Sequence, residues 1–428
     1  MNKELDRRVA PPVSPFGRLV LPPEKVYEAN GVRLHIVADR QCPMARICIL
    51  ARGGKNEASS RALAEAAARV LPEGSKRFDV DRTADIIDFH GASIAGRCTD
   101  HYTRLDLTAP SRYIAELLPL LAAILEAPDF PDIRLESIKS MLAAQCAYNR
   151  SRVDDIAERN ALALIAGGEH RFAQQVLPED FAAISKDATL DYLNALLCRD
   201  NIEIFLSGGV SDSLEEGVAQ IAADLPQGTS VPVHFLPFTP QEPQIKDIEV
   251  DGAEQCAVQA MIPAVPRSHP DYIPLRLAVT ALGGFFGSRL MQNIREDKGL
   301  TYGISSSLCG VQEGSYVDIA AQCAPQYTGQ LLDELRGELV KMATVPLTSD
   351  ELLRMRLYEQ TRLASVLDNA IATGDHYLTA ATIGMPPGYF SEQESVTATI
   401  TPDQIAEVSA RYLIPDNLRI VIAGLGQC

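Results

Sequence analysis

Two kinds of hydrophobic pattern alternate along the first half of the chain. Apolar, β-branched runs at 32–37 and 45–50 predict two strands that pair with each other, and a run at 201–207 predicts a third strand. Apolar residues spaced three or four positions apart predict helices between these strands. The expected helices span 61–71, 80–90, 113–125, 134–150, 156–166 and 188–197. Ser59 and Ser60 are candidate caps for the first of them.

The second half repeats this order after about 215 residues. The segment 184–205, a helix, an Asp-Asn turn and a strand, has a counterpart at 400–421. A second pair of matching segments, 109–118 and 324–332, has nearly the same offset. Two matches at nearly one offset indicate a duplicated domain. The proline-rich segment 226–243 between the copies is typical of a linker. Further strands are expected at 248–250 and 257–262, and further helices at 272–282, 331–342 and 349–363.

The most patterned stretch of the chain is 282–304, which reads LGGFFGSRLMQNIREDKGLTYGI. Ser288 is a candidate cap for a short helix, and Gly299 favours the left-handed conformation that ends one. The pattern therefore places Arg295 at the end of a helix.

From residue 300 the residue types suit a strand instead. Its alternation predicts that Tyr302, Ile304 and Ser306 lie on one face. An arginine and a tyrosine thus occupy consecutive elements.

Composition supports two globular domains and excludes several classes of protein. With 428 residues and 46% hydrophobic content, the chain is long enough to bury two cores. The net charge of −17 argues against a nucleic-acid-binding surface, and no apolar run is long enough to span a membrane. The start lacks the apolar core of a secretory signal, and nine cysteines without a C-x-x-C pair are expected to be reduced thiols. We expect a cytoplasmic protein, with the periplasm and organelles left open.

The run SRLMQNIREDKGLTYGI resembles the C-terminal-domain signature of the M16 zinc peptidases of the pitrilysin or processing-peptidase type, roughly SRLfqnLREkrGLaYsv. The resemblance implies that Arg295 and Tyr302 reach into a zinc site and hold or polarise the scissile carbonyl. It also implies that the preceding glycine-rich turn helps to engage substrate. The residues concerned are Gly283, Gly284, Phe285 and Phe286.

The same family carries H-x-x-E-H on a helix of its first domain, where two histidines bind zinc and the glutamate activates water. The matching block, 62–75, resembles the surrounding family sequence but has none of these three residues. Glu65 replaces the first histidine, Ala68 the glutamate and Arg69 the second histidine. A methyl group takes no proton from water, and a guanidinium has no lone pair for a metal. Glu65 and Arg69 are instead expected to form a surface ion pair worth about 0.3–0.5 kcal/mol.

No other set of zinc ligands is apparent. The third ligand of the family, a glutamate about 75 residues further on by resemblance, has no counterpart, because no acidic residue occurs between Ser137 and Val153. The histidines show no metal-ligand spacing and are expected to be hydrogen-bonded or exposed imidazoles. They are His35, His90, His101, His170, His234, His269 and His376.

The resemblance covers most of the chain and implies an α+β fold of two tandem homologous domains. Each domain is expected to be a mixed, largely antiparallel sheet covered by helices, and a pseudo-two-fold axis relates the two across a peptide cavity. The expected parts are an arm at 1–17, a first domain with a degenerate zinc site at 18–225, a linker at 226–245, and a second domain with the Arg/Tyr motif at 246–428.

These features favour a catalytically incompetent M16 subunit that binds no metal itself. It would pair with a separate chain bearing H-x-x-E-H and zinc, and would contribute Arg295 and Tyr302 to a metallopeptidase for unstructured peptides. The alternative is a non-enzymatic peptide-binding or scaffold protein that acts as a homodimer. An active peptidase with unrecognised ligands is a third possibility. No nucleic-acid or membrane partner is expected.

Overall fold

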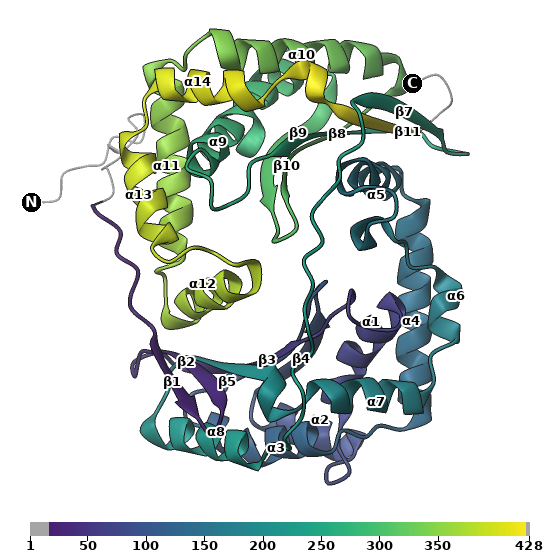
Figure 1. The fold of residues 1–428 in the computed structure, drawn as a ribbon, viewed down its shortest axis with the longest axis vertical. Coiled ribbons are helices and arrows are strands. Elements are labelled where there is room, and N and C mark those ends of the chain that lie inside the picture. Colours follow the sequence, from purple (N-terminus) through teal and green to yellow (C-terminus); the bar gives the residue numbers. More distant parts are fainter. Residues whose placement is uncertain (1–16, 425–428) are drawn as a thin grey trace, which may run out of the picture.

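The computed structural model describes residues 17–424, which form two mixed sheets with helices packed on them (Figure 1). The first sheet has the strand order β1-β2-β6-β3-β5-β4, in which β2 and β6 are parallel and all other neighbours are antiparallel. Its strands are β1 Lys25–Ala29, β2 Val32–Ala38, β3 Met44–Arg52, β4 Ser93–Cys98, β5 Tyr102–Pro110 and β6 Ile202–Gly208.

The prediction that the strands at 32–37 and 45–50 pair with each other is wrong. β6 lies between β2 and β3 and bonds to both of them. Every residue of β6 except Glu203 is buried, and a strand that is apolar on both faces suits the centre of a sheet. The prediction also missed β1, which forms a hairpin with β2 through Asn30 and Gly31, both at positive φ (54° and 86°).

The second sheet repeats this arrangement. Its order is β7-β11-β8-β10-β9, with β7 and β11 parallel and β11 inserted between β7 and β8. The strands are β7 Gln244–Glu249, β8 Cys256–Ala264, β9 Thr301–Gly310, β10 Ser315–Cys323 and β11 Arg419–Gly424. In both halves the last strand returns to the middle of the sheet, so the two halves are homologous α+β units, as expected. β7 begins inside the segment predicted as the linker.

The helices expected from apolar periodicity are present, with ends that differ by a few residues. Those of the first half are α1 Arg61–Val70, α2 Val80–Phe89, α3 Leu118–Glu126, α4 Asp132–Ser151, α5 Val153–Ala166, α6 Pro178–Ala182, α7 Lys186–Leu196 and α8 Asp212–Asp224. Those of the second half are α9 Tyr272–Val279, α10 Thr328–Thr344, α11 Ser349–Ser365, α12 Ala370–Ile383, α13 Tyr389–Thr399 and α14 Pro402–Tyr412. Four of these helices, α6, α8, α12 and α13, were not predicted; most of the residues that α12 buries are small or polar.

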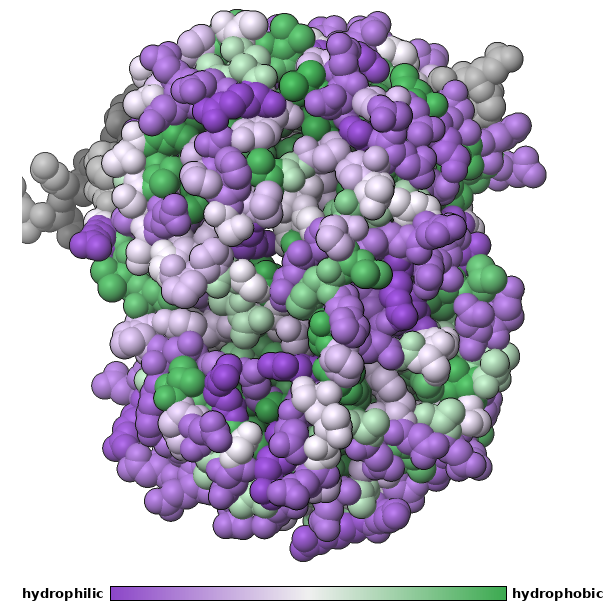
Figure 2. Space-filling view, viewed as in Figure 1, coloured by the Kyte–Doolittle hydropathy of each residue, from purple (hydrophilic) through white to green (hydrophobic). Residues whose placement is uncertain are grey.

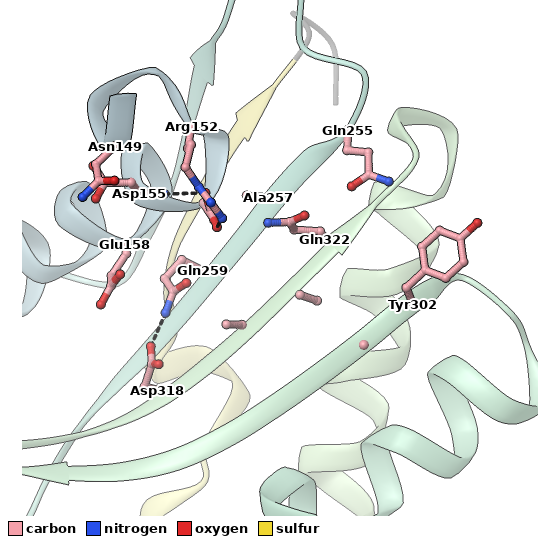
Figure 3. A pocket seen from close by; sticks show the side chains of 14 residues that line it. Asn149, Arg152, Asp155, Glu158, Gln255, Ala257, Gln259, Tyr302, Asp318 and Gln322 are labelled. Carbon is pink, nitrogen blue, oxygen red and sulfur yellow. Dashed lines mark hydrogen bonds and ion pairs between the residues drawn. The ribbon is translucent and has the colours of Figure 1, made fainter. Parts of the chain in front are cut away.

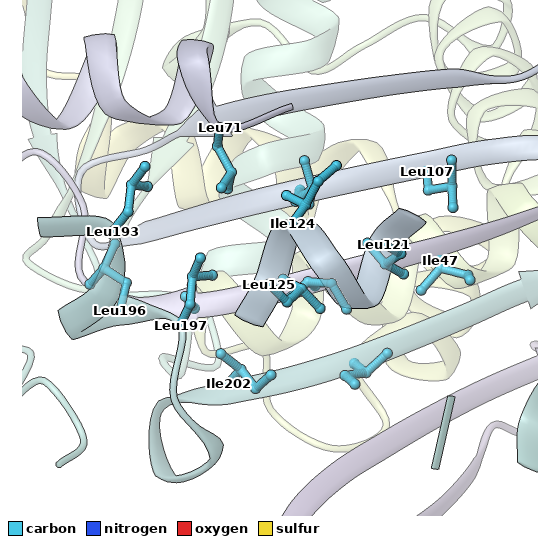
Figure 4. Close-up of a cluster of buried hydrophobic side chains, with 14 of the residues drawn as sticks. Ile47, Leu71, Leu107, Leu121, Ile124, Leu125, Leu193, Leu196, Leu197 and Ile202 are labelled. Atoms are coloured by element: carbon cyan, nitrogen blue, oxygen red, sulfur yellow. The ribbon is translucent and has the colours of Figure 1, made fainter. Parts of the chain in front are cut away.

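Each half has its own hydrophobic core between its sheet and its helices. In the first core, side chains of α3 and α7 meet those of the strands, as Figure 4 shows for Leu121, Leu193 and Ile47. In the second core, α9, α10, α11 and α14 pack around β8, β9 and β10. Burying one such aliphatic side chain contributes about 1.5–3 kcal/mol, so both cores are substantial.

The two halves also exchange a helix. α5 of the first half packs on β8 and β11 of the second sheet through Ala157, Ala161 and Leu164. α12 of the second half packs on β2 and β6 of the first sheet through Leu378. Figure 1 shows both helices between the two sheets. Each sheet therefore has part of its inner face covered by a helix from the other half.

The segment 226–243 runs between the halves without helix or strand (Figure 1). Its Phe238 N–H donates to the Glu313 carbonyl at 3.0 Å, and its Thr239 N–H donates to the Ala166 carbonyl at 3.0 Å. The segment is thereby tied to both halves.

The face of the molecule seen in Figure 2 is mostly hydrophilic, with hydrophobic residues in small scattered patches. Small patches are typical of a protein surface exposed to water and single out no large apolar interface on this face.

Candidate functional site

Arg295 lies on a helix, 289–297, whose second part, Met291–Asp297, is a π-helix. At its end the Lys298 N–H donates to the Asn293 carbonyl, five residues back, at 3.2 Å. Gly299 follows at φ 62°, which confirms it as the left-handed stop. The prediction that Ser288 caps this helix is wrong, because its buried hydroxyl has no hydrogen-bond partner among the described residues. π-Helical turns occur frequently at functional sites.

Polar contacts fix this helix on its neighbours. The Arg289 Nε donates to Glu351 Oε1 of α11 at 2.8 Å, and Asn293 donates to Glu334 and Glu338 of α10 at 2.9 and 2.8 Å. Burial opposes ionisation of Glu351, but hydrogen bonds, chiefly from Arg289, outweigh it and lower the pKa of this carboxyl to about 2. The backbone that carries Arg295 is therefore anchored on both sides.

The Arg295 side chain lies over an aromatic ring. Its guanidinium carbon is 4.9 Å from the centroid of Phe286, and its Nη1 is 3.4 Å from Glu296 Oε1. Phe285 instead turns inward and stacks on Tyr358 with centroids 5.3 Å apart. Arg295 is thus half-exposed and held by contacts that are weak individually.

The glycines before this helix do not form the predicted turn. Gly283 and Gly284 belong to a second π-helix, Thr280–Gly284, that continues α9. A Cβ at Gly283 would lie 2.7 Å from the Ser306 hydroxyl oxygen, so the glycine allows the helix to approach β9 closely. Of the four residues predicted to bind substrate, Phe286 alone is exposed, and their role in binding stays a prediction.

Tyr302 lies at a bulge in β9, an edge strand. The register with β10 slips by one residue between Thr301 and Ile304, and both of those residues are buried. Tyr302, between them, is 89% exposed, and within residues 17–424 its hydroxyl has no hydrogen-bond partner. The prediction that Tyr302 shares a face with Ile304 and Ser306 is therefore wrong, because the bulge turns its side chain outward.

A cavity of about 710 Å³ lies between the halves, on the part of the second sheet that α5 leaves open (Figure 3). Tyr302 stands at one end of it in Figure 3, while Arg295 is not among the residues that line it. The lining residues are Asn149, Arg152, Asp154, Asp155, Glu158, Gln255, Ala257, Gln259, Tyr302, Gly303, Asp318, Ala320, Ala321 and Gln322.

Acidic groups from both halves set the electrostatics of this cavity. Burial raises the pKa of Asp318 to about 6, the nearby Glu158 adds to the rise, and a hydrogen bond from Gln259 opposes it. Burial also raises the pKa of Glu158, helped by Asp155. No sequence spacing pointed to this set, because the packing of α5 on the second sheet brings the groups together.

The degenerate zinc-motif residues lie on α1. Glu65 Oε2 is 3.4 Å from Lys55 Nζ, so the predicted Glu65–Arg69 ion pair is wrong, and Arg69 is exposed. Ala68 is 1% exposed, and a Cβ added at Gly96 of β4 would overlap its carbonyl oxygen. An ammonium group thus neutralises the carboxylate at the first ligand position, where a metal would otherwise do so.

Among residues 17–424, no group of three or more histidine, cysteine, aspartate or glutamate side chains is arranged to hold a metal ion. The residues at the motif positions do not fit zinc, because they offer a single carboxylate that an ammonium already neutralises. Seven of the cysteines in this described range are free thiols, whereas Cys256 is disulfide-bonded, which corrects the expectation that all nine are reduced.

Comparisons with known proteins agree with the loss of the zinc-binding residues on α1. A family model described as the Peptidase M16 inactive domain matches residues 183–357. The chain is similar to the non-peptidase homolog YmxG of Helicobacter pylori, with 24% identity over 292 residues, which is 65% of each chain. It is also similar to the uncharacterized zinc protease YmxG of Bacillus subtilis, with 21% identity over 282 residues, covering 65% of this chain and 68% of that one.

Solved structures share the whole fold. A peptidase M16 inactive domain from Pseudomonas fluorescens superposes with a TM-score of 0.84 at 22% identity, over 94% of this chain and 98% of that one. A periplasmic protease from Escherichia coli, PqqL, gives a TM-score of 0.76 at 16% identity, over 98% of this chain and 49% of that one. In the part of the chain that the structure describes, no helix is long and apolar enough to cross a membrane. The chain is thus an M16-like inactive peptidase homologue, which lacks the H-x-x-E-H motif and retains the arginine and tyrosine of the second-domain motif.

Proposed function

We propose that this chain is the non-catalytic subunit of a heteromeric M16 metallopeptidase. A partner chain bearing H-x-x-E-H would hold zinc and activate water, and this chain would contribute Arg295 and Tyr302. The two side chains would bind an extended peptide and donate hydrogen bonds to its scissile carbonyl. A donor aimed at a developing oxyanion is worth about 2.7–4 kcal/mol, so a chain without zinc still has a measurable part in catalysis.

The observation that carries this proposal is the exposure of Tyr302. A bulge turns the ring out of the sheet, leaving it 89% exposed beside the cavity, with no partner for its hydroxyl within the described residues. Bulges that redirect a side chain are common beside active sites. A tyrosine placed in this way buries little surface in the isolated chain, and its hydroxyl is available to donate to a group supplied by a substrate.

Arg295 adds support of a different kind. Its backbone is anchored through Arg289 and Asn293, yet among residues 17–424 its guanidinium contacts only Phe286 and Glu296. Exposed contacts of these two kinds are each worth about 1 kcal/mol or less. A substrate carbonyl or a partner's carboxylate can therefore compete for the guanidinium without unfolding the helix.

The test is to reconstitute the pair. This chain would be co-expressed with an M16 chain that carries H-x-x-E-H, and the complex would be purified and assayed on an unstructured peptide. Arg295→Ala with Tyr302→Phe is expected to lower kcat/KM by about a hundredfold or more, while the complex still forms. The matched control, Arg40→Ala with Tyr327→Phe, alters an exposed arginine and a tyrosine outside the motif and should leave kcat/KM unchanged.

Full activity of the Arg295/Tyr302 double variant would refute the proposed roles. A chain that forms only homodimers and binds peptide without any zinc chain would instead support the scaffold. The cytoplasmic location stays a prediction.

A further inference from the structure

A cluster of three ionisable side chains crosses the junction between the two halves. His101, in the turn between β4 and β5, has its Nδ1 2.7 Å from Glu57 Oε1 of the loop before α1. Its Nε2 is in hydrogen-bond contact with Glu313 Oε1, in the turn between β9 and β10. One imidazole ring thus joins a carboxylate of the first half to a carboxylate of the second.

All three side chains are shielded from water. The side chains of Glu57, His101 and Glu313 are 9%, 8% and 2% exposed. The ring of Phe235, from the segment 226–243, lies edge-on to His101 with centroids 4.8 Å apart. When one member of a buried ion pair loses its charge, the fold is strongly destabilised, because the other charge is left buried without a counter-charge.

The chemistry of the ring makes the cluster depend on one proton. A neutral imidazole donates from one nitrogen and accepts at the other, whereas an imidazolium donates from both. Only the imidazolium can donate to Glu57 and Glu313 together. Burial opposes the charged ring, but the hydrogen bonds to the two carboxylates, Glu313 first, outweigh it and raise the pKa of His101 to about 9.

Another cation close to the cluster already has partners of its own. Arg61 is engaged by Asn56 and Asp100, at 2.5 and 2.9 Å. Cavities of about 110 and 440 Å³ flank the cluster. The other titratable or charged side chains that line them are Asp100, Tyr102, His170, Arg171 and His234. His170 Nε2 is already bonded to the Leu236 carbonyl at 2.9 Å.

We propose that Glu57, His101 and Glu313 form a proton-dependent latch that holds the β9–β10 turn of the second half, together with the segment 235–238, on the first half. When His101 loses its proton, one of the two carboxylates faces a ring lone pair, and the turn is released. β9 and β10 carry one wall of the cavity that Tyr302 borders, so the latch sets how that wall is held. The latch does not depend on the proposed peptidase role.

A second cluster of the same composition provides a matched control. His35 lies between Glu24 and Glu203, at 2.9 and 3.1 Å, entirely within the first half. Removing this histidine alters a Glu–His–Glu arrangement without touching the junction at Glu313.

The first test is hydrogen exchange measured by mass spectrometry on the full chain at pH 7. In the nearly isosteric variant Glu313→Gln, amides of 310–315 and 235–238 should exchange about tenfold faster than in the wild type, because the charged partner is lost. In the control His35→Gln these amides should exchange as in the wild type. Unchanged exchange in Glu313→Gln, or equal acceleration in both variants, would overturn the latch.

The second test addresses the proton and stays informative if one variant folds poorly. The unfolding equilibrium constant of the wild type should rise with pH, approaching about tenfold per pH unit between pH 6.5 and 9, relative to that of His101→Gln. The pKa of His101 is higher in the folded state than in the unfolded state. The stabilisation by His101 is therefore fully present below the unfolded-state pKa and is lost as the pH rises through the folded-state pKa. Parallel pH profiles for the wild type and His101→Gln would refute the dependence on the proton.

Discussion

Substituting Ala68 by glutamate would put back the side chain that acts as general base in the active members of the family. Ala68 is 1% exposed on α1, and β4 approaches so closely at Gly96 that a Cβ there would overlap the Ala68 carbonyl oxygen. Because the Ala68 side chain is buried, a glutamate there must either displace its neighbours or bury its carboxyl group. We expect Ala68→Glu to destabilise the fold.

The magnitude has two parts. Forcing a larger side chain into a packed site costs about 1–3 kcal/mol. Burying an unpartnered polar group costs about 1–3 kcal/mol more on the basis of mutational data. The sum, about 2–6 kcal/mol, is a large share of the 5–15 kcal/mol by which folded proteins are usually stable.

Urea unfolding of the full chain, followed by far-ultraviolet circular dichroism, measures this loss. Ala68→Gln separates the packing cost from the charge, and Arg69→His, at the exposed neighbouring position, should stay within about 0.5 kcal/mol of the wild type. If Ala68→Glu were also within 0.5 kcal/mol, its carboxylate would be reaching water, and the argument that α1 is closed at this position would fail.

Three further outcomes are expected. The triple variant that restores the full H-x-x-E-H motif should not retain one zinc per chain after dialysis, as measured by metal analysis, because α4 has no acidic residue between Ser137 and Val153 to supply the third ligand. Leu378→Ala should cost about 2–5 kcal/mol in urea unfolding, because this buried side chain joins α12 to the first sheet. The pKa of Glu351 is depressed, so the wild type should lose stability as the pH falls from 4.5 to about 2, and Glu351→Gln should lack this pH-dependent stabilisation. Matching acid-unfolding profiles of the two proteins would contradict this.

Local pattern accounted for most helices and most strands, because their apolar residues recur at the period of the element. It failed where distant segments decide the outcome. The central place of β6 depends on its pairing with β2 and β3, which are more than a hundred residues away. The partner of Glu65 is Lys55 rather than Arg69, because the loop before α1 folds back over the helix.

The motif that contains Arg295 and Tyr302 shows the same difference between what local pattern predicts and what packing decides. Sequence alone placed Arg295 on a helix and Tyr302 on a strand, and both placements hold. The π-helix and the bulge that orient the two side chains follow from how these elements pack on α10 and β10, which no local spacing reveals. The acidic cavity was missed for a related reason, since Glu158 and Asp318 belong to different halves and meet only through α5.

The exchange of α5 and α12 between the halves has a consequence for the chain as it is synthesised. The first sheet is complete once β6 has emerged at Gly208, but α12, which covers Leu50 and Phe205, begins only at Ala370. At about 5–20 residues per second, a ribosome needs on the order of 10–30 s to add the intervening residues. During that interval the nascent first half presents an uncovered apolar surface, which is the kind of surface that chaperones bind. A first half released alone would keep that surface permanently, so we expect it to aggregate where the full chain does not.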